Sequence, residues 1–226
     1  MPSPALSRLL SLTGLAPLGA FLLLHVVING AVLWGASTFD GIAAVLHDIP
    51  ALWLLETLLV FAPLAIHAGL GTWFVIVGAP LAAPRPYSLP MRAAVRATGV
   101  GAAVFLAAHL LEFRFRNPGV RLDGAELETL LAADLSSTTH GIPWRGVSYL
   151  IGTACVCIHF VAGVWGAVLS ARGSARRWAG PVLGALGALV WMTFVAVVVF
   201  HATGARPFRT HQADRAATEP CPLSPR

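Results

Sequence analysis

The chain has 226 residues, of which 57% are hydrophobic and 11% are charged, and its mean hydropathy is +0.75. A soluble domain carries about 25% charged residues, so this chain cannot cover a water-facing surface and belongs in a lipid bilayer. Its net charge of +5 comes from 15 Arg, with no Lys, against 10 acidic residues. This excess suits the orientation of a membrane protein better than nucleic-acid binding. The three cysteines form no disulfide framework.

A helix needs about 20 apolar residues to span the hydrocarbon core. Five stretches qualify, and we call them spans I to V: residues 12–35, 51–78, 94–113, 147–170 and 181–203. The sequence therefore predicts an all-α membrane bundle of five transmembrane helices over residues 1–203. The polar residues 204–226 are expected to form a disordered C-terminal tail. Span I is too long, and its leading segment too weakly charged, for a signal peptide.

The connections between the spans carry two further signals. Asp123 and Glu126 form a capping-box pattern ahead of a leucine-rich segment, which predicts a short surface helix between spans III and IV. The N-terminus and the second and fourth connections carry arginines and no acid, which predicts a cytoplasmic N-terminus. These arginines are Arg8, Arg85, Arg92, Arg96, Arg172, Arg176 and Arg177. Four arginines in the tail oppose this orientation.

Four histidines lie deep inside spans I to IV, one in each span: His25, His67, His109 and His159. Ionisable side chains at membrane depth are costly and mark functional sites. A single intramembrane histidine is more often an interhelical hydrogen-bonder than a ligand. One histidine on each of four consecutive helices favours ligand sites.

The depths of these histidines divide them into two pairs. Counted from the cytoplasmic ends of their spans, His25 and His109 lie 15 and 16 residues in, whereas His67 and His159 lie 10 and 11 residues in. At 1.5 Å per residue, the first pair is about 8 Å nearer the outer face. We expect each pair to face one another, with ring nitrogens about 4 Å apart around a metal.

Two histidines per layer suit haem better than zinc, because a haem iron already has four porphyrin nitrogens whereas zinc takes four protein or water ligands. Several glycines share the faces of these histidines and leave room for a flat macrocycle or for close helix packing. They are Gly71, Gly152, Gly163 and Gly166. The two histidine pairs, together with these glycines, thus favour two b-type haems over two zinc sites.

The order and spacing of five strings make a family recognisable. The strings are RLLSLTG from Arg8, HVVIN from His25, PLAIHAGLG from Pro63, RATG from Arg96 with His109, and IHFVAGVW from Ile158. Over residues 7–203 they resemble the di-haem cytochrome b558 subunit, the membrane anchor of succinate:menaquinone and quinol:fumarate reductases.

The resemblance implies five spans and two haem b groups, a proximal one held by His67 and His159 and a distal one held by His25 and His109. It also implies a place in the bacterial inner membrane, with a flavoprotein subunit and an iron-sulfur subunit docked on the cytoplasmic side. Electrons would pass through the haems to or from menaquinone near the distal haem. Such a chain is an electron conduit and carries no succinate chemistry of its own.

Other residues are candidates for supporting roles. Arg96 is the first candidate for binding the haem propionates, and Arg8, Ser11 and Thr13 are further ones. For proton transfer to or from the quinone, Asp40 in the first outer connection is the candidate, with Glu56 and Glu112 as rivals. Asn29, one turn after His25, is a candidate hydrogen-bond donor to a quinone carbonyl. His47, His140, His201 and His211 are expected to be bystanders, and Cys155 and Cys157 small packing residues.

One position departs from the family pattern. Some quinol:fumarate reductases have a carboxylate two residues before the fourth haem histidine, where this chain has Cys157. This favours succinate oxidation over fumarate reduction as the working direction.

Three alternatives stay open at this level. One is the cytochrome b subunit of another membrane complex, of the hydrogenase or formate dehydrogenase type. Another is a proton or solute transporter with a histidine relay. The third is an anchor that has lost its haem.

Overall fold

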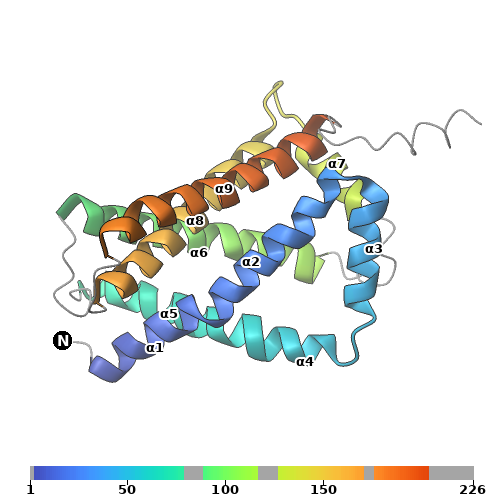
Figure 1. Cartoon of the computed structure of the whole chain (residues 1–226). Helices are drawn as coiled ribbons and strands as arrows, with labels where there is room; N and C mark the ends of the chain where they lie inside the picture. Colours follow the sequence, from blue (N-terminus) through green and yellow to red (C-terminus); the bar gives the residue numbers. More distant parts are fainter. Residues whose placement is uncertain (1–2, 79–88, 117–126, 171–175, 204–226) are drawn as a thin grey trace, which may run out of the picture.

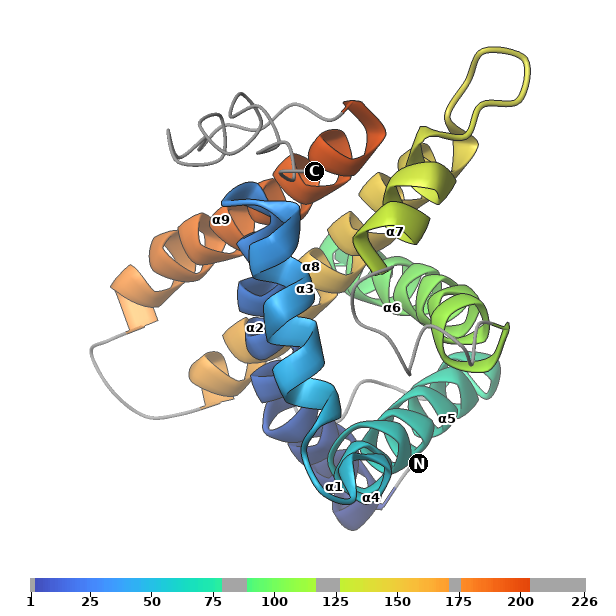
Figure 2. The ribbon, with the colours of Figure 1, turned by 90° about the vertical axis from the view of Figure 1, so that its right-hand side faces the viewer.

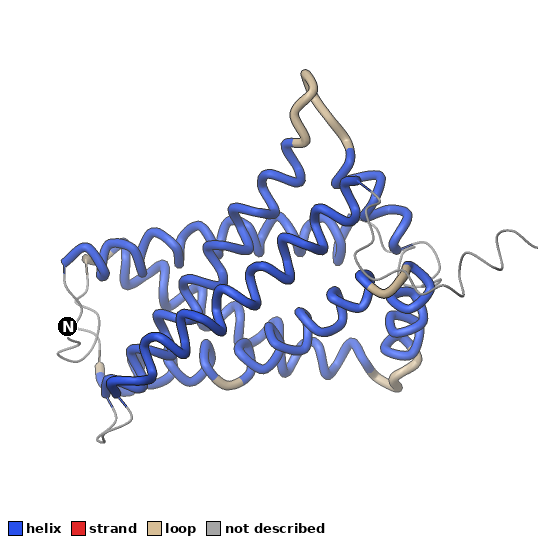
Figure 3. Tube along the Cα trace, turned by 45° about the horizontal axis from the view of Figure 1, so that its top comes forward, coloured by secondary structure: helices blue, strands red, loops and turns tan. Residues whose placement is uncertain are grey.

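The computed structural model describes residues 3–78, 89–116, 127–170 and 176–203 (Figure 1). The predicted disordered tail at 204–226 and the capping-box residues Asp123 and Glu126 lie outside these described residues. Within them the chain is mostly helical (Figure 3), and Thr139 pairs with Ile142 in an isolated antiparallel bridge.

Five helical segments in the described residues are long and apolar enough to cross a membrane, which confirms the predicted five-span all-α architecture. They are Ala5–Leu33, Leu52–Ile76, Pro90–Phe115, Trp144–Val168 and Ala179–Thr203. Large apolar side chains are widely exposed along them, such as Val27 at 70% and Ile76 at 74%. Such surface suits lipid and not water.

Span I consists of α1 (Pro4–Leu15), α2 (Pro17–Gly30) and the 3₁₀ turn η1 (Ala31–Leu33). The Ser3 side chain caps α1 by accepting the N–H of Leu6 at 3.3 Å. Pro17 has no N–H to donate, so the hydrogen-bond ladder is interrupted there and α2 starts as a new helix. The span therefore begins about two turns earlier than the sequence predicts.

The first connection is a helix that the sequence pattern did not predict, α3 (Ala36–His47). Gly35 precedes it at φ +152° and ψ 154°, a conformation open to glycine and hardly to other residues, and this lets the chain turn sharply out of span I. Viewed from the end of the bundle, α3 runs across the helix ends (Figure 2).

Span II consists of α4 (Leu52–Glu56), the π-helical segment η2 (Thr57–Phe61) and α5 (Ala62–Ile76). Pro63 in the first turn of α5 cannot make the usual i to i−4 hydrogen bond, and the wider π turn accommodates it. Span III likewise ends in a π-helical segment, since α6 (Leu89–Leu110) is followed by η3 (Leu111–Arg116).

The predicted surface helix between spans III and IV is present as α7 (Leu127–Ser136) and packs on α9 (Arg176–Thr203). Spans IV and V are α8 (Trp144–Ser170) and α9, which run side by side, and α8 also packs against α6. A buried cluster joins α3 and α7 to the ends of spans I and V: Val32, Leu33, Phe39, Leu131, Val197 and Phe200.

The bundle has two distinct ends (Figure 1). We call the end with the starts of α1, α6 and α9 the N-terminal end, and the opposite end the α3/α7 end. Exposed tryptophans stand near both, with Trp34, Trp53 and Trp144 at the α3/α7 end and Trp73 toward the N-terminal end. Tryptophan favours the membrane–water interface, so these rings mark the two interfaces.

Candidate functional site

The four intramembrane histidines meet as two pairs inside the bundle. His25 on α2 faces His109 on α6 with ring centroids 6.0 Å apart and ring planes at 83°. His67 on α5 faces His159 on α8, also at 6.0 Å, with ring planes at 75°. These are the two pairs that the depth count predicts.

Backbone carbonyls orient the rings of the pair nearer the N-terminal end. Nδ1 of His67 lies 2.9 Å from the carbonyl oxygen of Leu10, and Nδ1 of His159 lies 3.1 Å from that of Val95. A carbonyl accepts only from a protonated nitrogen, so Nδ1 carries the hydrogen in both rings and Nε2 keeps its lone pair. Both rings thus offer Nε2 as a metal ligand.

Two glycines allow these rings to sit against neighbouring helices. A Cβ on Gly99 of α6 would lie 2.8 Å from Cε1 of His159, and a Cβ on Gly14 of α1 would overlap the ring of His67. Real Cβ atoms do not approach other atoms so closely. The glycines that end the RLLSLTG and RATG strings therefore have a direct steric role beside the histidines.

Aromatic rings surround the pair nearer the α3/α7 end. Phe21 stacks on His25 at 5.3 Å, and Phe105 stacks on His109 at 5.8 Å. The hydroxyl of Tyr149 lies 3.2 Å from Nδ1 of His109, and it donates to Oε2 of Glu112 at 3.2 Å. Because the Tyr149 hydroxyl donates its hydrogen to Glu112, it accepts a hydrogen bond from Nδ1–H of His109. Nε2 of His109 is then free to act as a ligand.

The donor set of each pair fits a haem iron. In the described residues no three His, Cys, Asp or Glu side chains come together to hold a metal ion, so each pair offers two protein ligands. Two metal–nitrogen bonds of about 2 Å each, with the distance from each nitrogen to its ring centre added, account for the 6.0 Å between ring centroids. Two imidazoles complete an iron that is already bound by four porphyrin nitrogens.

The neighbourhood of the pairs is apolar and contains space. A cavity of about 300 Å³ lies between α5 and α6, close to the neighbours of His67 and His109. Its lining is Phe61, Leu64, Ala65, Ala68, Ala103, Leu106, Ala107, Leu110 and Phe115. Gly163, one turn after His159, has no atom within 4 Å of where its Cβ would stand. Open apolar space is therefore present along the helices that carry His67, His109 and His159.

The other predicted glycines act in helix packing. A Cβ on Gly152 would overlap the ring of Phe105, and one on Gly71 would meet Leu10 at 3.9 Å. Likewise, a Cβ on Gly101 would lie 2.8 Å from the sulfur of Cys155, which places that cysteine in the contact between α6 and α8.

Among the candidates for propionate binding, Arg96 directly follows Val95, the residue whose carbonyl orients His159, and is half-buried at the same level. Arg8 is exposed on α1. The hydroxyl of Thr13 is buried and donates to the carbonyls of Leu9 and Leu10 within its own helix, at 2.8 and 3.2 Å. Arg96 is therefore the best placed of these residues.

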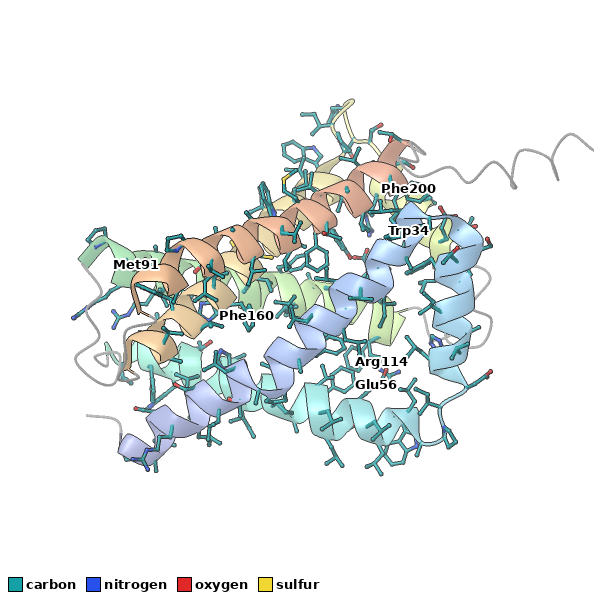
Figure 4. The ribbon with its side chains drawn as sticks, in the orientation of Figure 1. Trp34, Glu56, Met91, Arg114, Phe160 and Phe200 are labelled. Carbon is teal, nitrogen blue, oxygen red and sulfur yellow. The ribbon has the colours of Figure 1, made fainter. Side chains whose placement is uncertain are left out.

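The three candidate carboxylates have different surroundings. Oδ1 of Asp40 on α3 is buried without a hydrogen-bond partner in the described residues. Glu56 forms an ion pair of 2.7 Å with Arg114 (Figure 4), and Glu112 forms one with Arg145. The amide of Asn29 donates to the carbonyl of His25 at 2.8 Å, so one of its two N–H bonds is used inside α2.

The sequence pattern missed two polar contacts. His201, expected to have no partner at its depth, is 4% exposed and has the Glu128 carboxylate 3.8 Å from its Nδ1. Tyr149 carried no signal, because a tyrosine near a helix end in a membrane protein is ordinarily read as an interface residue. Both contacts join residues that are far apart in the chain.

Comparisons with known proteins point to one family. The chain is 28% identical over 159 residues to the succinate dehydrogenase cytochrome b558 subunit of Bacillus subtilis (strain 168), which covers 70% of this chain and 75% of that relative. No protein-family model and no solved structure match the chain. The similarity supports the resemblance that the histidine strings predict: this membrane protein is similar to a cytochrome b558 subunit of succinate dehydrogenase.

Proposed function

We propose that this chain is the membrane anchor and di-haem cytochrome b subunit of a succinate:quinone oxidoreductase, which passes electrons between an iron-sulfur subunit and menaquinone. The observation that carries the proposal is the pair of facing histidine couples, each with ring centroids 6.0 Å apart, stacked at two depths of one bundle. The related Bacillus subtilis protein, a cytochrome b558 subunit, supports the same function.

His67 and His159 would hold one haem b toward the N-terminal end, and His25 and His109 the other toward the α3/α7 end. A haem bound by two imidazoles supplies reversible one-electron chemistry. The contribution of the chain is to fix four Nε2 atoms and to exclude water with apolar walls. The carbonyls of Leu10 and Val95 and the hydroxyl of Tyr149 orient the rings of His67, His159 and His109. The ring of His25 is instead stacked on Phe21.

The N-terminal end is the proposed docking face for the iron-sulfur subunit. It presents the exposed cations Arg8 and Arg92, and half-buried Arg96 directly follows Val95, whose carbonyl oxygen lies 3.1 Å from Nδ1 of His159. Arginine at this position would balance the propionate charges of the haem in low dielectric. By the positive-inside rule, this end faces the cytoplasm.

Quinone chemistry is proposed for the α3/α7 end, with Asp40 as the proton-transferring residue. Glu56 and Glu112 each form an ion pair with an arginine, whereas Oδ1 of Asp40 is buried with no partner in the described residues. A carboxylate oxygen without a partner is able to accept a hydroxyl hydrogen from a quinol. The pairing of its rivals therefore favours Asp40.

The haem content of purified wild-type protein tests the proposal. We expect low-spin b-type reduced-minus-oxidised spectra and two haems per chain by the pyridine haemochrome assay. His25→Ala and His109→Ala should remove the same haem, and His67→Ala and His159→Ala the other. A colourless chain after haem-replete expression would refute the proposal and favour the hypothesis of a proton or solute transporter with a histidine relay. Copurification with hydrogenase or formate dehydrogenase subunits would instead indicate that the chain is the cytochrome b subunit of that complex.

A further inference from the structure

We propose that Tyr149 is a positioning residue for His109, held in place by Glu112 and Arg145, and that this polar chain sets the redox potential of the haem at the α3/α7 end. The inference rests on the proposed function, because it assumes that His109 binds haem iron. It adds roles for three residues that the histidine pattern does not identify.

The four side chains form a continuous series of contacts. Nδ1 of His109 lies 3.2 Å from the Tyr149 hydroxyl, and that hydroxyl lies 3.2 Å from Oε2 of Glu112. The other carboxylate oxygen of Glu112, Oε1, is ion-paired with Arg145. Arg145 also reaches Oδ2 of Asp134 at 2.9 Å.

Residues from four elements converge in this series. His109 lies in the last turn of α6 and Glu112 follows three residues later in η3, so both point from one face of span III. Tyr149 and Arg145 stand one turn apart on α8, and Asp134 belongs to the surface helix α7. The orientation of the His109 ring is thus fixed by contacts that reach the exposed end of the bundle.

The surroundings of Tyr149 hold its ring firmly. Its ring packs edge-on against Phe105 at 5.2 Å and against Phe113 at 6.4 Å. Because these contacts involve the ring and not the hydroxyl, phenylalanine should keep the packing and lose the hydrogen bonds alone.

The other haem has a different arrangement. His67 and His159 donate Nδ1–H to neutral backbone carbonyls, whereas the acceptor for His109 is a hydroxyl that itself donates to a carboxylate. A hydrogen-bond chain that ends on an anion polarises each member. The hydrogen bond that Nδ1–H of His109 donates is therefore stronger, and this makes Nε2 a stronger electron donor to the iron.

A stronger imidazole donor favours ferric over ferrous iron. Loss of the Tyr149 hydroxyl should therefore raise the midpoint potential of one haem and leave the other unchanged. Outer-shell partners of metal-bound histidines typically affect metal affinity by about 10–100-fold. A tenfold change in the ratio of oxidised to reduced haem corresponds to about 59 mV for a one-electron couple.

The experiment is a redox titration of Tyr149→Phe in the full chain, followed by optical spectra and by electron paramagnetic resonance of the ferric haems. We expect one midpoint potential to rise by about 59 mV, equal to the tenfold change, with a changed ferric signal from the same haem. Repeating the titration in a His67→Ala background, which should retain only the haem of His25 and His109, assigns the shift. Glu112→Leu should shift the same haem in the same direction.

Ser148→Ala is a matched control from the neighbouring position of α8, because it removes an exposed hydroxyl that donates to the backbone carbonyl of Arg145 and not to a side chain of the series. It should leave both potentials unchanged. If wild type binds two haems and Tyr149→Phe leaves both potentials and both ferric signals as they were, the inference is wrong and the proposed function stands. If the wild-type protein does not bind two haems, both the proposed function and this inference are wrong.

Discussion

His67 on α5 and Gly14 on α1 touch so closely that the glycine has no room for a side chain. The same relation joins His159 on α8 to Gly99 on α6, where an added Cβ would come within 2.8 Å of the ring. Both histidines of the pair nearer the N-terminal end therefore rest on a glycine of a neighbouring helix.

Gly99→Ala should displace the ring of His159 and so weaken or remove one haem while leaving the other. The physical reason is overlap with a ring that is fixed by its bond to the Val95 carbonyl, 3.1 Å away. Haem stoichiometry and reduced-minus-oxidised spectra measure the effect. Gly69→Ala is the matched control, because nothing lies within 4 Å of its added Cβ. Equal haem loss in both variants would contradict the steric role.

Asp40→Asn should reduce quinone-coupled electron transfer, because the amide cannot accept a proton as a carboxylate does. General acid–base groups contribute about 10²–10⁴-fold to rates, so a loss of about 10²-fold or more is expected. In the complex assembled with the flavoprotein and iron-sulfur subunits, succinate oxidation with a quinone should fall. Oxidation with an artificial dye, and the haem content, should stay at wild-type levels.

Asp48→Asn offers a control from the end of the same helix, since Asp48 is the exposed C-cap residue of α3. It should retain quinone activity. Full quinone activity in Asp40→Asn would exclude Asp40 as the proton-transferring group and return attention to Glu56 and Glu112.

The ion pair between Arg114 and Glu56 should stabilise the junction of η3 with α4. Both side chains are largely buried, at 19% and 32% exposure, and Arg114 also lies over the Phe61 ring at 5.5 Å. Arg114→Leu should lower the free energy of unfolding by about 1–3 kcal/mol, because it leaves a carboxylate without its positive partner. Thermal unfolding in detergent measures this.

The double variant Glu56→Leu with Arg114→Leu should be more stable than Arg114→Leu alone, because it removes the charge left behind. If the loss of unfolding free energy in the double variant equals the sum of the losses in Glu56→Leu and Arg114→Leu, the two side chains do not interact.

His201 should tolerate an apolar replacement. Both of its ring nitrogens are buried and make no hydrogen bond in the described residues, and the nearest Glu128 oxygen lies 3.8 Å from Nδ1. Because an unsatisfied buried polar group costs about 1–3 kcal/mol, His201→Leu should unfold at the same temperature as wild type or higher. Phe200→Ala, in the neighbouring 1%-exposed position, should instead cost about 3–5 kcal/mol. A comparable loss in His201→Leu would show that the ring has a polar partner.

The sequence alone determined the five spans and the membership of the two histidine pairs. Both depend on properties that do not require knowledge of neighbouring helices. The length of an apolar run decides whether a helix can cross a bilayer, and the fixed rise of 1.5 Å per residue converts position in a span into depth. His25 with His109, and His67 with His159, follow from that count before any contact is known.

The tertiary structure decided what surrounds each ring. Whether Tyr149 or a backbone carbonyl meets Nδ1 depends on how each helix is rotated about its axis and on contacts over 40 to 64 positions of sequence. The same holds for Gly14 against His67, for Glu128 beside His201 and for Oδ1 of Asp40, which is buried without a hydrogen-bond partner among the described residues. The helix α3 also escaped prediction, because its Phe39 is buried against residues of α9 and α7 that lie far along the chain. Depth is a local property of one helix, whereas a contact needs two helices to be placed together.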